Sequence, residues 1–92
     1  MPKFRKKYDV EAIRVEDALT AAKAQAYSLI PDWLRDPWSS GRAYFLDDRI
    51  QIETAEGTKV GAPKDWIVSE GPGRIYVRTA DAFAAMYEAV EA

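Results

Sequence analysis

Hydrophobic and polar side chains alternate most regularly between Arg49 and Thr54. Ile50, Ile52 and Thr54 fall on one side of an extended chain there, and the residues between them are polar. Because strand side chains alternate between two faces, this spacing predicts a half-buried strand. Residues 49–77 as a whole read as three short strands separated by turns, and we expect the rest of the chain to cover their apolar face.

Shorter runs of the same kind predict further strands. The most distinct turn is Glu70-Gly71-Pro72-Gly73, where glycine supplies the positive φ that a tight hairpin needs. Near the N-terminus, Val10 and Ala12 share one parity and Ile13 has the other. This indicates either apolar cover on both faces of that strand or a bulge. The expected strands are residues 8–15, 43–46, 49–54, 58–60, 65–69 and 74–78.

A helix is predicted directly after the first strand. Asp17 can serve as its N-cap, with Glu16 as a nearby alternative, and either carboxylate favours the positive end of the helix dipole. Pro31 is expected to end it, because the residue before a proline is pushed out of the helical region. The narrow apolar stripe of this alanine-rich helix consists of Leu19, Ala22, Ala26 and then Leu29 or Ile30.

Residues 31–38 connect this helix to the following strands and hold Trp33 and Trp38. Because Pro31 and Pro37 lie in the segment, it is expected to form a short turn of helix at most. The two indole rings carry much apolar area for a connection. They are expected either to fold back as a lid on the core or to form an exposed interface.

A second helix is predicted at the C-terminus. Thr79 is its expected N-cap, and Phe83, Met86, Tyr87 and Val90 recur at helical spacing behind it. Strands in sequence with helices at both ends indicate an α+β fold. The prediction is a single domain, residues 1–92, with one small curved antiparallel sheet of about five strands, one helix after the first strand and one C-terminal helix.

Composition and charge exclude several classes of function. Hydrophobic residues make up 48% of the 92 residues, which is typical of an ordinary globular chain. The 15 acidic and 13 basic residues give a net charge of −2, which argues against nonspecific nucleic-acid binding. Cysteine is absent, and no apolar run has the length of a membrane span. We expect a soluble, cytosolic protein.

Catalytic chemistry finds little support in the residues present. Without histidine or cysteine, the chain offers no imidazole base, no thiol nucleophile and none of the common zinc sites. Carboxylate pairs occur at Asp47-Asp48 and at Asp32 with Asp36. The ordinary interpretation of such pairs at turn and surface positions is that they are solvated and form no catalytic or metal site. The sequence therefore predicts a protein that is not an enzyme and holds no metal and no cofactor.

Aromatic and arginine side chains near the turns are the best candidates for binding. Such residues are enriched in interface hot spots, and they can also stack a base and hold a phosphate. The alternative is that these rings, above all Trp66 and Tyr76 within strands, belong to the core or to cross-strand pairs. The candidate partner-binding residues are Trp33, Arg35, Trp38, Arg42, Arg74, Tyr76 and Arg78.

The two ends of the chain resemble a family of small, mostly uncharacterised tailed-bacteriophage proteins. In that family a lysine- and phenylalanine-rich start leads into a strand that ends Glu-Ala-Ile. The C-terminal part has a Glu-Gly-Thr turn, a Pro-Gly-Asp-Trp-Ile type strand, a tyrosine-containing hairpin and an aromatic helix. Here Lys64 replaces the glycine and Tyr8 a common proline. The matching residues are Lys3-Phe4-Arg5-Lys6-Lys7, Glu11-Ala12-Ile13, Glu56-Gly57-Thr58, Pro63-Lys64-Asp65-Trp66-Ile67, Tyr76, Asp81, Phe83 and Tyr87.

The resemblance implies a phage or prophage origin and brings no catalytic residue with it. By analogy, the leading hypothesis is a binding protein in the host bacterial cytoplasm that inhibits or sequesters a host protein, such as an anti-phage defence factor. One alternative is a sponge for a cyclic or ADP-ribose-like nucleotide signal; another is a structural or assembly factor of the phage. The basic stretch Lys3-Phe4-Arg5-Lys6-Lys7 is expected to be either a solvated arm or an anion-binding arm, and the oligomeric state stays open.

Overall fold

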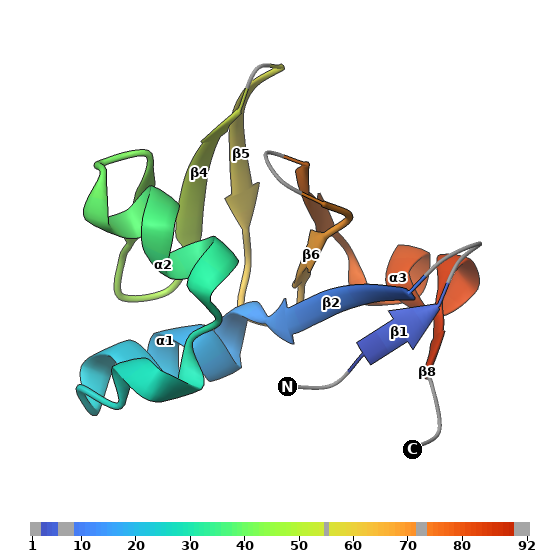
Figure 1. The fold of residues 1–92 in the computed structure, drawn as a ribbon, viewed down its shortest axis with the longest axis horizontal. Coiled ribbons are helices and arrows are strands. Elements are labelled where there is room, and N and C mark those ends of the chain that lie inside the picture. Colours follow the sequence, from blue (N-terminus) through green and yellow to red (C-terminus); the bar gives the residue numbers. More distant parts are fainter. Residues whose placement is uncertain (1–2, 6–8, 55, 72–73, 90–92) are drawn as a thin grey trace.

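The chain forms two antiparallel sheets and three α-helices in a computed structural model that describes residues 3–5, 9–54, 56–71 and 74–89 (Figure 1). Expectations about Lys6, Lys7, Tyr8, Val90 and the Pro72-Gly73 centre of the last turn lie outside these residues. The helices are α1 (Val15–Lys23), α2 (Asp32–Ser39) and α3 (Ala80–Met86), with a short 3-10 turn, η1 (Tyr27–Leu29), between the first two.

The α+β class is confirmed, but the strands divide between two sheets instead of forming one. The chain turns at Ala62, whose N–H donates to Asp65 Oδ2, and the strand that follows pairs with β2 rather than with β5. One sheet has the order β7-β6-β2-β1-β8 and the other β3-β4-β5. The strands are β1 (Lys3–Arg5), β2 (Asp9–Arg14), β3 (Ala43–Phe45), β4 (Ile50–Thr54), β5 (Gly57–Gly61), β6 (Trp66–Ser69), β7 (Ile75–Arg78) and β8 (Glu88–Ala89).

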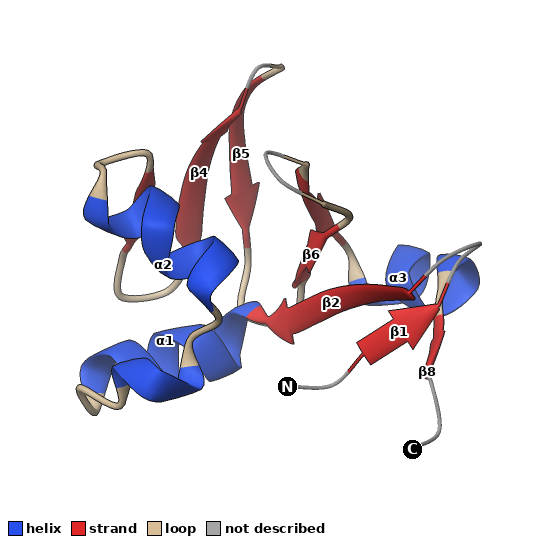
Figure 2. Cartoon of the chain, viewed as in Figure 1, coloured by secondary structure: helices blue, strands red, loops and turns tan. Residues whose placement is uncertain are grey.

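Both faces of β2 carry buried residues, as one interpretation of its sequence predicts. Val10 and Ala12 belong to a cluster that includes Phe83 of α3, whereas Ile13 belongs to a larger cluster that includes Ile50 and residues of α1 and α2. The five-stranded sheet therefore has α3 on one face and, on the other, the three-stranded sheet with α1 and α2 (Figure 2). Burial of Ile50 and Ile52 confirms the predicted inner face of β4.

Helix α1 begins and ends earlier than the sequence predicts. Its N-cap is Arg14, which makes no side-chain cap, because the N–H groups of Val15 and Glu16 donate to the carbonyls of Asp65 and Pro63. A neighbouring turn thus satisfies the helix start that Asp17 was expected to cap. At the other end, Gln25 has a φ of 58°, which stops the helix before Pro31 is reached.

Residues 32–39 form an eight-residue helix that contains Pro37, although a short turn at most was expected. Pro31 stands at the N-cap, where its missing N–H costs nothing, and its carbonyl accepts from the N–H groups of Leu34 and Arg35. Leu34 is buried, and both Trp33 and Trp38 are partly buried against the larger cluster. The two indole rings therefore cover the core in part, which supports the lid interpretation.

The C-terminal helix has the predicted cap but is shorter than predicted. Thr79 Oγ1 accepts a hydrogen bond from the Ala82 N–H at 3.1 Å. Phe83 stacks on Trp66 with ring centroids 4.2 Å apart, which fixes α3 against the sheet. After Met86 the backbone becomes extended at Tyr87, and β8 then pairs with β1. The prediction that Tyr87 continues the helix is wrong, because its backbone is extended and sheet pairing follows it.

Candidate functional site

A cavity of about 950 Å³ lies between the two sheets beside α2. A Cβ added at Gly61 of β5 would lie 3.4 Å from a methyl of Val77 in β7, so the two sheets approach closely there. The cavity lies farther along these strands, between residues of β4 and residues of β2, β6 and β7. We call it the inter-sheet cavity. Its lining residues are Glu11, Asp32, Trp33, Asp36, Pro37, Arg42, Ile52, Glu53, Thr54, Ser69, Gly71 and Ile75.

Strand register explains the floor of the cavity. Glu11 pairs with Ser69, and Ser69 pairs with Ile75, so these three side chains form a row on one face of the sheet. Two residues along the strands, Ile13 and Ile67 occupy the same face and are buried in the larger cluster. The cavity is therefore a continuation of the core, at the end where polar residues replace apolar ones.

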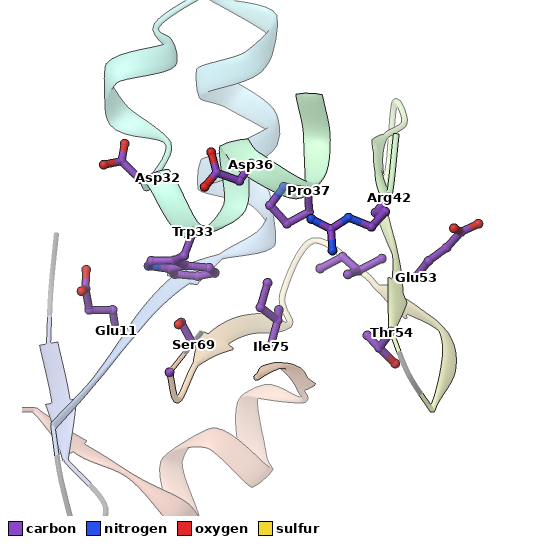
Figure 3. A pocket seen from close by; sticks show the side chains of 12 residues that line it. Glu11, Asp32, Trp33, Asp36, Pro37, Arg42, Glu53, Thr54, Ser69 and Ile75 are labelled. Atoms are coloured by element: carbon purple, nitrogen blue, oxygen red, sulfur yellow. The ribbon is translucent and has the colours of Figure 1, made fainter. Parts of the chain in front are cut away.

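Trp33 forms the wall between this cavity and a second one. Figure 3 shows its indole ring projecting from α2 toward the strand that carries Ser69. A side cavity of about 580 Å³ shares Trp33, Asp32 and Glu11 with the first and extends toward Leu29, whose side chain is 69% exposed. We call the two cavities and the ring between them the Trp33 surface.

The indole N–H of Trp33 is buried and has no hydrogen-bond partner among the described residues. Most buried donors in proteins are paired, and leaving one unpaired costs about 1–3 kcal/mol. Packing against the larger cluster, rather than a hydrogen bond within the described chain, therefore holds the ring in place.

Charged groups are unevenly placed around the inter-sheet cavity. Figure 3 shows the carboxylates of Glu11 and Asp36 on the Trp33 side, while Glu53 points away from the cavity. Asp32 forms an ion pair with Arg35. Arg42 reaches toward the cavity from the start of β3, and its Nε donates to Ser40 Oγ at 3.0 Å.

The structure brings together three of the seven candidate residues. Trp33 and Arg42 line the inter-sheet cavity, and Trp33 and Arg35 line the side cavity. Trp38 instead stacks on Phe45, with centroids 4.5 Å apart and an interplanar angle of 7°, and also contacts Tyr27. Trp38 is therefore part of the packing beneath α2, as the lid interpretation predicts.

The last hairpin does not join the Trp33 surface through its candidate residues. Tyr76 and Arg78 alternate with Ile75 and Val77 along β7, so they lie on the opposite face from the cavity floor. The Arg78 guanidinium lies 4.8 Å from the centroid of the Tyr76 ring, and both residues line a small cavity of about 200 Å³. Arg74 is exposed at the beginning of this hairpin strand.

Sequence reasoning missed several residues of the Trp33 surface. Glu11, Ser69 and Ile75 come from three strands that meet only because β2 pairs with β6. The polar Glu11 lies between Val10 and Ala12, a local signal for the uncovered end of a face. No signal in the chain identifies which strand lies beside it.

Within the described ranges, no group of three or more carboxylate, histidine or cysteine residues could hold a metal ion. No helix in that part of the chain is both long and apolar enough to cross a membrane. Comparison with models of known protein families finds no match, and comparisons with curated proteins and with solved structures find none either.

Proposed function

We propose that the chain is a non-enzymatic binding protein that captures a partner protein through the Trp33 surface. The observation that carries this proposal is the pair of cavities that meet at a half-buried tryptophan. Ligand pockets in proteins commonly measure about 300–1,000 Å³ and combine apolar walls with a few polar groups. The inter-sheet cavity, at about 950 Å³, falls in this range.

The residues at the rim have the chemistry of a protein interface. Tryptophan and arginine are enriched among interface hot spots, and the most effective positions are surrounded by groups that exclude water. Here Trp33 and Arg35 adjoin the exposed Leu29, with Ile13 and Ile30 in the lining of the side cavity. An apolar residue of a partner would be covered on several sides there.

The resemblance of the chain ends to small phage proteins suggests the biological setting. On that analogy the partner is a host protein in the bacterial cytoplasm, such as a defence factor, which the chain would inhibit or sequester. Binding by a surface anchored on one tryptophan requires no catalytic group, which suits a chain without histidine or cysteine.

The first experiment is capture from bacterial lysate, followed by titration of the retained protein after its purification. We expect Trp33→Ala to weaken binding at least about 30-fold, because removal of a hot-spot residue costs about 2 kcal/mol or more. Tyr44→Ala is the matched control, since Tyr44 is an exposed aromatic residue outside both cavities. Equal binding by the Trp33 and Tyr44 variants would reject the proposal.

Leu29→Ser provides a second variant that does not depend on the core packing of Trp33. Its side chain is 69% exposed, so folding should be unaffected while the partner loses an apolar contact. We expect binding to weaken by about threefold to tenfold. Circular dichroism of both variants checks that the fold is retained.

A nucleotide ligand is the second candidate, because Arg42 reaches toward a cavity whose wall is an indole ring. Arginine could hold a phosphate while the ring stacks on the base. A ligand that binds only the folded chain raises its melting temperature. Cyclic and ADP-ribose-like nucleotides should then stabilise the wild type and not Arg42→Ala; no shift across such a panel would remove this candidate.

A further inference from the structure

We propose that the Trp33 surface receives a lysine or arginine side chain of the partner, placed beside the indole ring and near Asp36 and Glu11. This inference rests on the proposed function, because it specifies the chemistry of the segment that the same surface binds. Three observations support it. Among the described side chains, the Trp33 ring lacks the contacts that other aromatic rings make, carboxylates outnumber cations in the lining of the inter-sheet cavity, and part of that lining is apolar.

Ring contacts set Trp33 apart from the other aromatic residues near the cavities. Trp66 has the Arg14 guanidinium 4.8 Å from its ring centroid, and Tyr76 has Arg78 at the same distance. Among the residues whose side chains the structure describes, neither a cation nor another aromatic ring makes such a contact with Trp33. Tryptophan is the side chain that attracts cations most strongly through its ring.

The charge around the ring favours the same type of ligand. Four carboxylates are among the lining residues of the inter-sheet cavity, and Glu53 points away from it. Glu11, Asp32 and Asp36 then stand against the single cation Arg42, while Arg14 and Arg35 line the side cavity. Asp32 is already paired with Arg35. Asp36, which has no ion pair among the described residues, therefore carries most of the charge argument.

The cavity can also accept the aliphatic part of such a side chain. Pro37, Ile52 and Ile75 provide apolar lining next to the charged rim. Lysine and arginine bury their methylene stems against apolar surface while keeping the charged end near water or a carboxylate. A short neutral side chain would use the apolar lining but leave Asp36 without a partner.

The test uses short blocked peptides that are identical except for one central residue, which is lysine, arginine, norleucine or glutamate. Binding is followed through the indole N–H signal of Trp33, assigned by comparison with Trp33→Phe. We expect the lysine and arginine peptides to bind about tenfold more tightly than the norleucine peptide and the glutamate peptide more weakly still. Raising the salt concentration should reduce the difference.

Charge variants separate a specific site from the general acidity of the protein. We expect Glu11→Gln with Asp36→Asn to weaken binding of the lysine peptide about threefold to tenfold and to leave the norleucine peptide unchanged. Asp47→Asn with Asp48→Asn removes the same charge at an exposed turn outside both cavities. This control should bind the lysine peptide like the wild type.

Failure of this inference can be distinguished from failure of the proposed function. Absence of binding by both cationic peptides at millimolar concentration, equal binding of the norleucine peptide, or preference for the glutamate peptide would overturn the inference. If Trp33→Ala still abolished capture of the purified partner, the proposed function would stand without it. If capture were unchanged by Trp33→Ala while the lysine peptide bound, the proposed function would fall instead.

Discussion

Tyr87 is a buried residue whose side chain makes a polar contact. Its hydroxyl donates a hydrogen bond to Glu70 Oε2 at 2.6 Å, and its ring lies 5.1 Å from that of Phe83. Burial raises the pKa of Tyr87 above its usual value of 10.0, and the hydrogen bond to Glu70 raises it further. Arg78 lowers the pKa in part. The hydrogen bond between Tyr87, at the end of α3, and Glu70, directly after β6, can be donated only while the tyrosine hydroxyl is protonated.

This link predicts a pH-dependent difference between the wild type and Tyr87→Phe. The variant should lose about 1.5–3 kcal/mol at neutral pH, because a hydrogen bond to a charged acceptor is removed. A folded-state pKa above the unfolded value contributes stability that is complete below about pH 10 and is lost as the pH rises through the folded pKa. Urea unfolding of both proteins from pH 7 upward should show the difference shrinking above about pH 10; a constant difference would contradict the assignment.

At the scale of elements, helix boundaries depend on what supplies the terminal hydrogen bonds. The start of α1 is satisfied by the carbonyls of Asp65 and Pro63, which are distant in sequence, whereas α3 relies on the adjacent Thr79. Local sequence therefore predicts the cap of α3 correctly and that of α1 wrongly. The same contrast indicates which helix should respond to a change at its cap.

Substitution of Thr79 tests this dependence. Thr79→Ala should destabilise the protein by about 1 kcal/mol, because it leaves the Ala82 N–H without its acceptor. Thr79→Ser keeps the hydroxyl oxygen and should remain near the wild type. Asp17→Asn should change stability much less than Thr79→Ala, because backbone carbonyls satisfy the start of α1. The free energies of unfolding from chemical denaturation provide the comparison, and equal losses for alanine and serine would refute the role of the hydroxyl.

At the scale of the whole molecule, two apolar clusters share the same strands. Ile13 and Ile67 face the larger cluster, while their chain neighbours Ala12 and Val68 face the cluster beneath α3. Gly61 of β5 lies close to both α1 and the five-stranded sheet, because an added Cβ would lie 2.8 Å from a methyl of Val15 and 3.4 Å from a methyl of Val77. Packing on one face of the five-stranded sheet should therefore depend on packing on the other.

Shared strands predict a single cooperative unfolding transition. Ile52→Val in the larger cluster should cost about 0.5–1.5 kcal/mol, and Val68→Ala in the other cluster should also destabilise by creating a cavity. Each change should move the tryptophan fluorescence and far-ultraviolet circular dichroism midpoints together. Separation of the two signals in either variant would show that the clusters unfold independently and would argue against one domain.

The sequence by itself determined the features that depend on near neighbours. The α+β class, the inner face of β4 at Ile50 and Ile52, and the cap at Thr79 all follow from local spacing or from a side chain three residues away. For β2, the side-chain parity allowed either cover on both faces or a bulge, and the structure has the former. In each case the physical cause, side-chain parity or a local hydrogen bond, lies within a few residues of the chain.

Tertiary structure alone decided how the strands divide between sheets and which side chains meet. The row Glu11, Ser69 and Ile75 exists because β2 pairs with β6, and Trp33 covers it because α2 is a full helix. Trp38 packs against Phe45. Tyr76 and Arg78 lie on the face of β7 opposite to the cavity floor. Contacts between residues far apart in the chain depend on the packing of whole faces, which no local pattern of residues specifies.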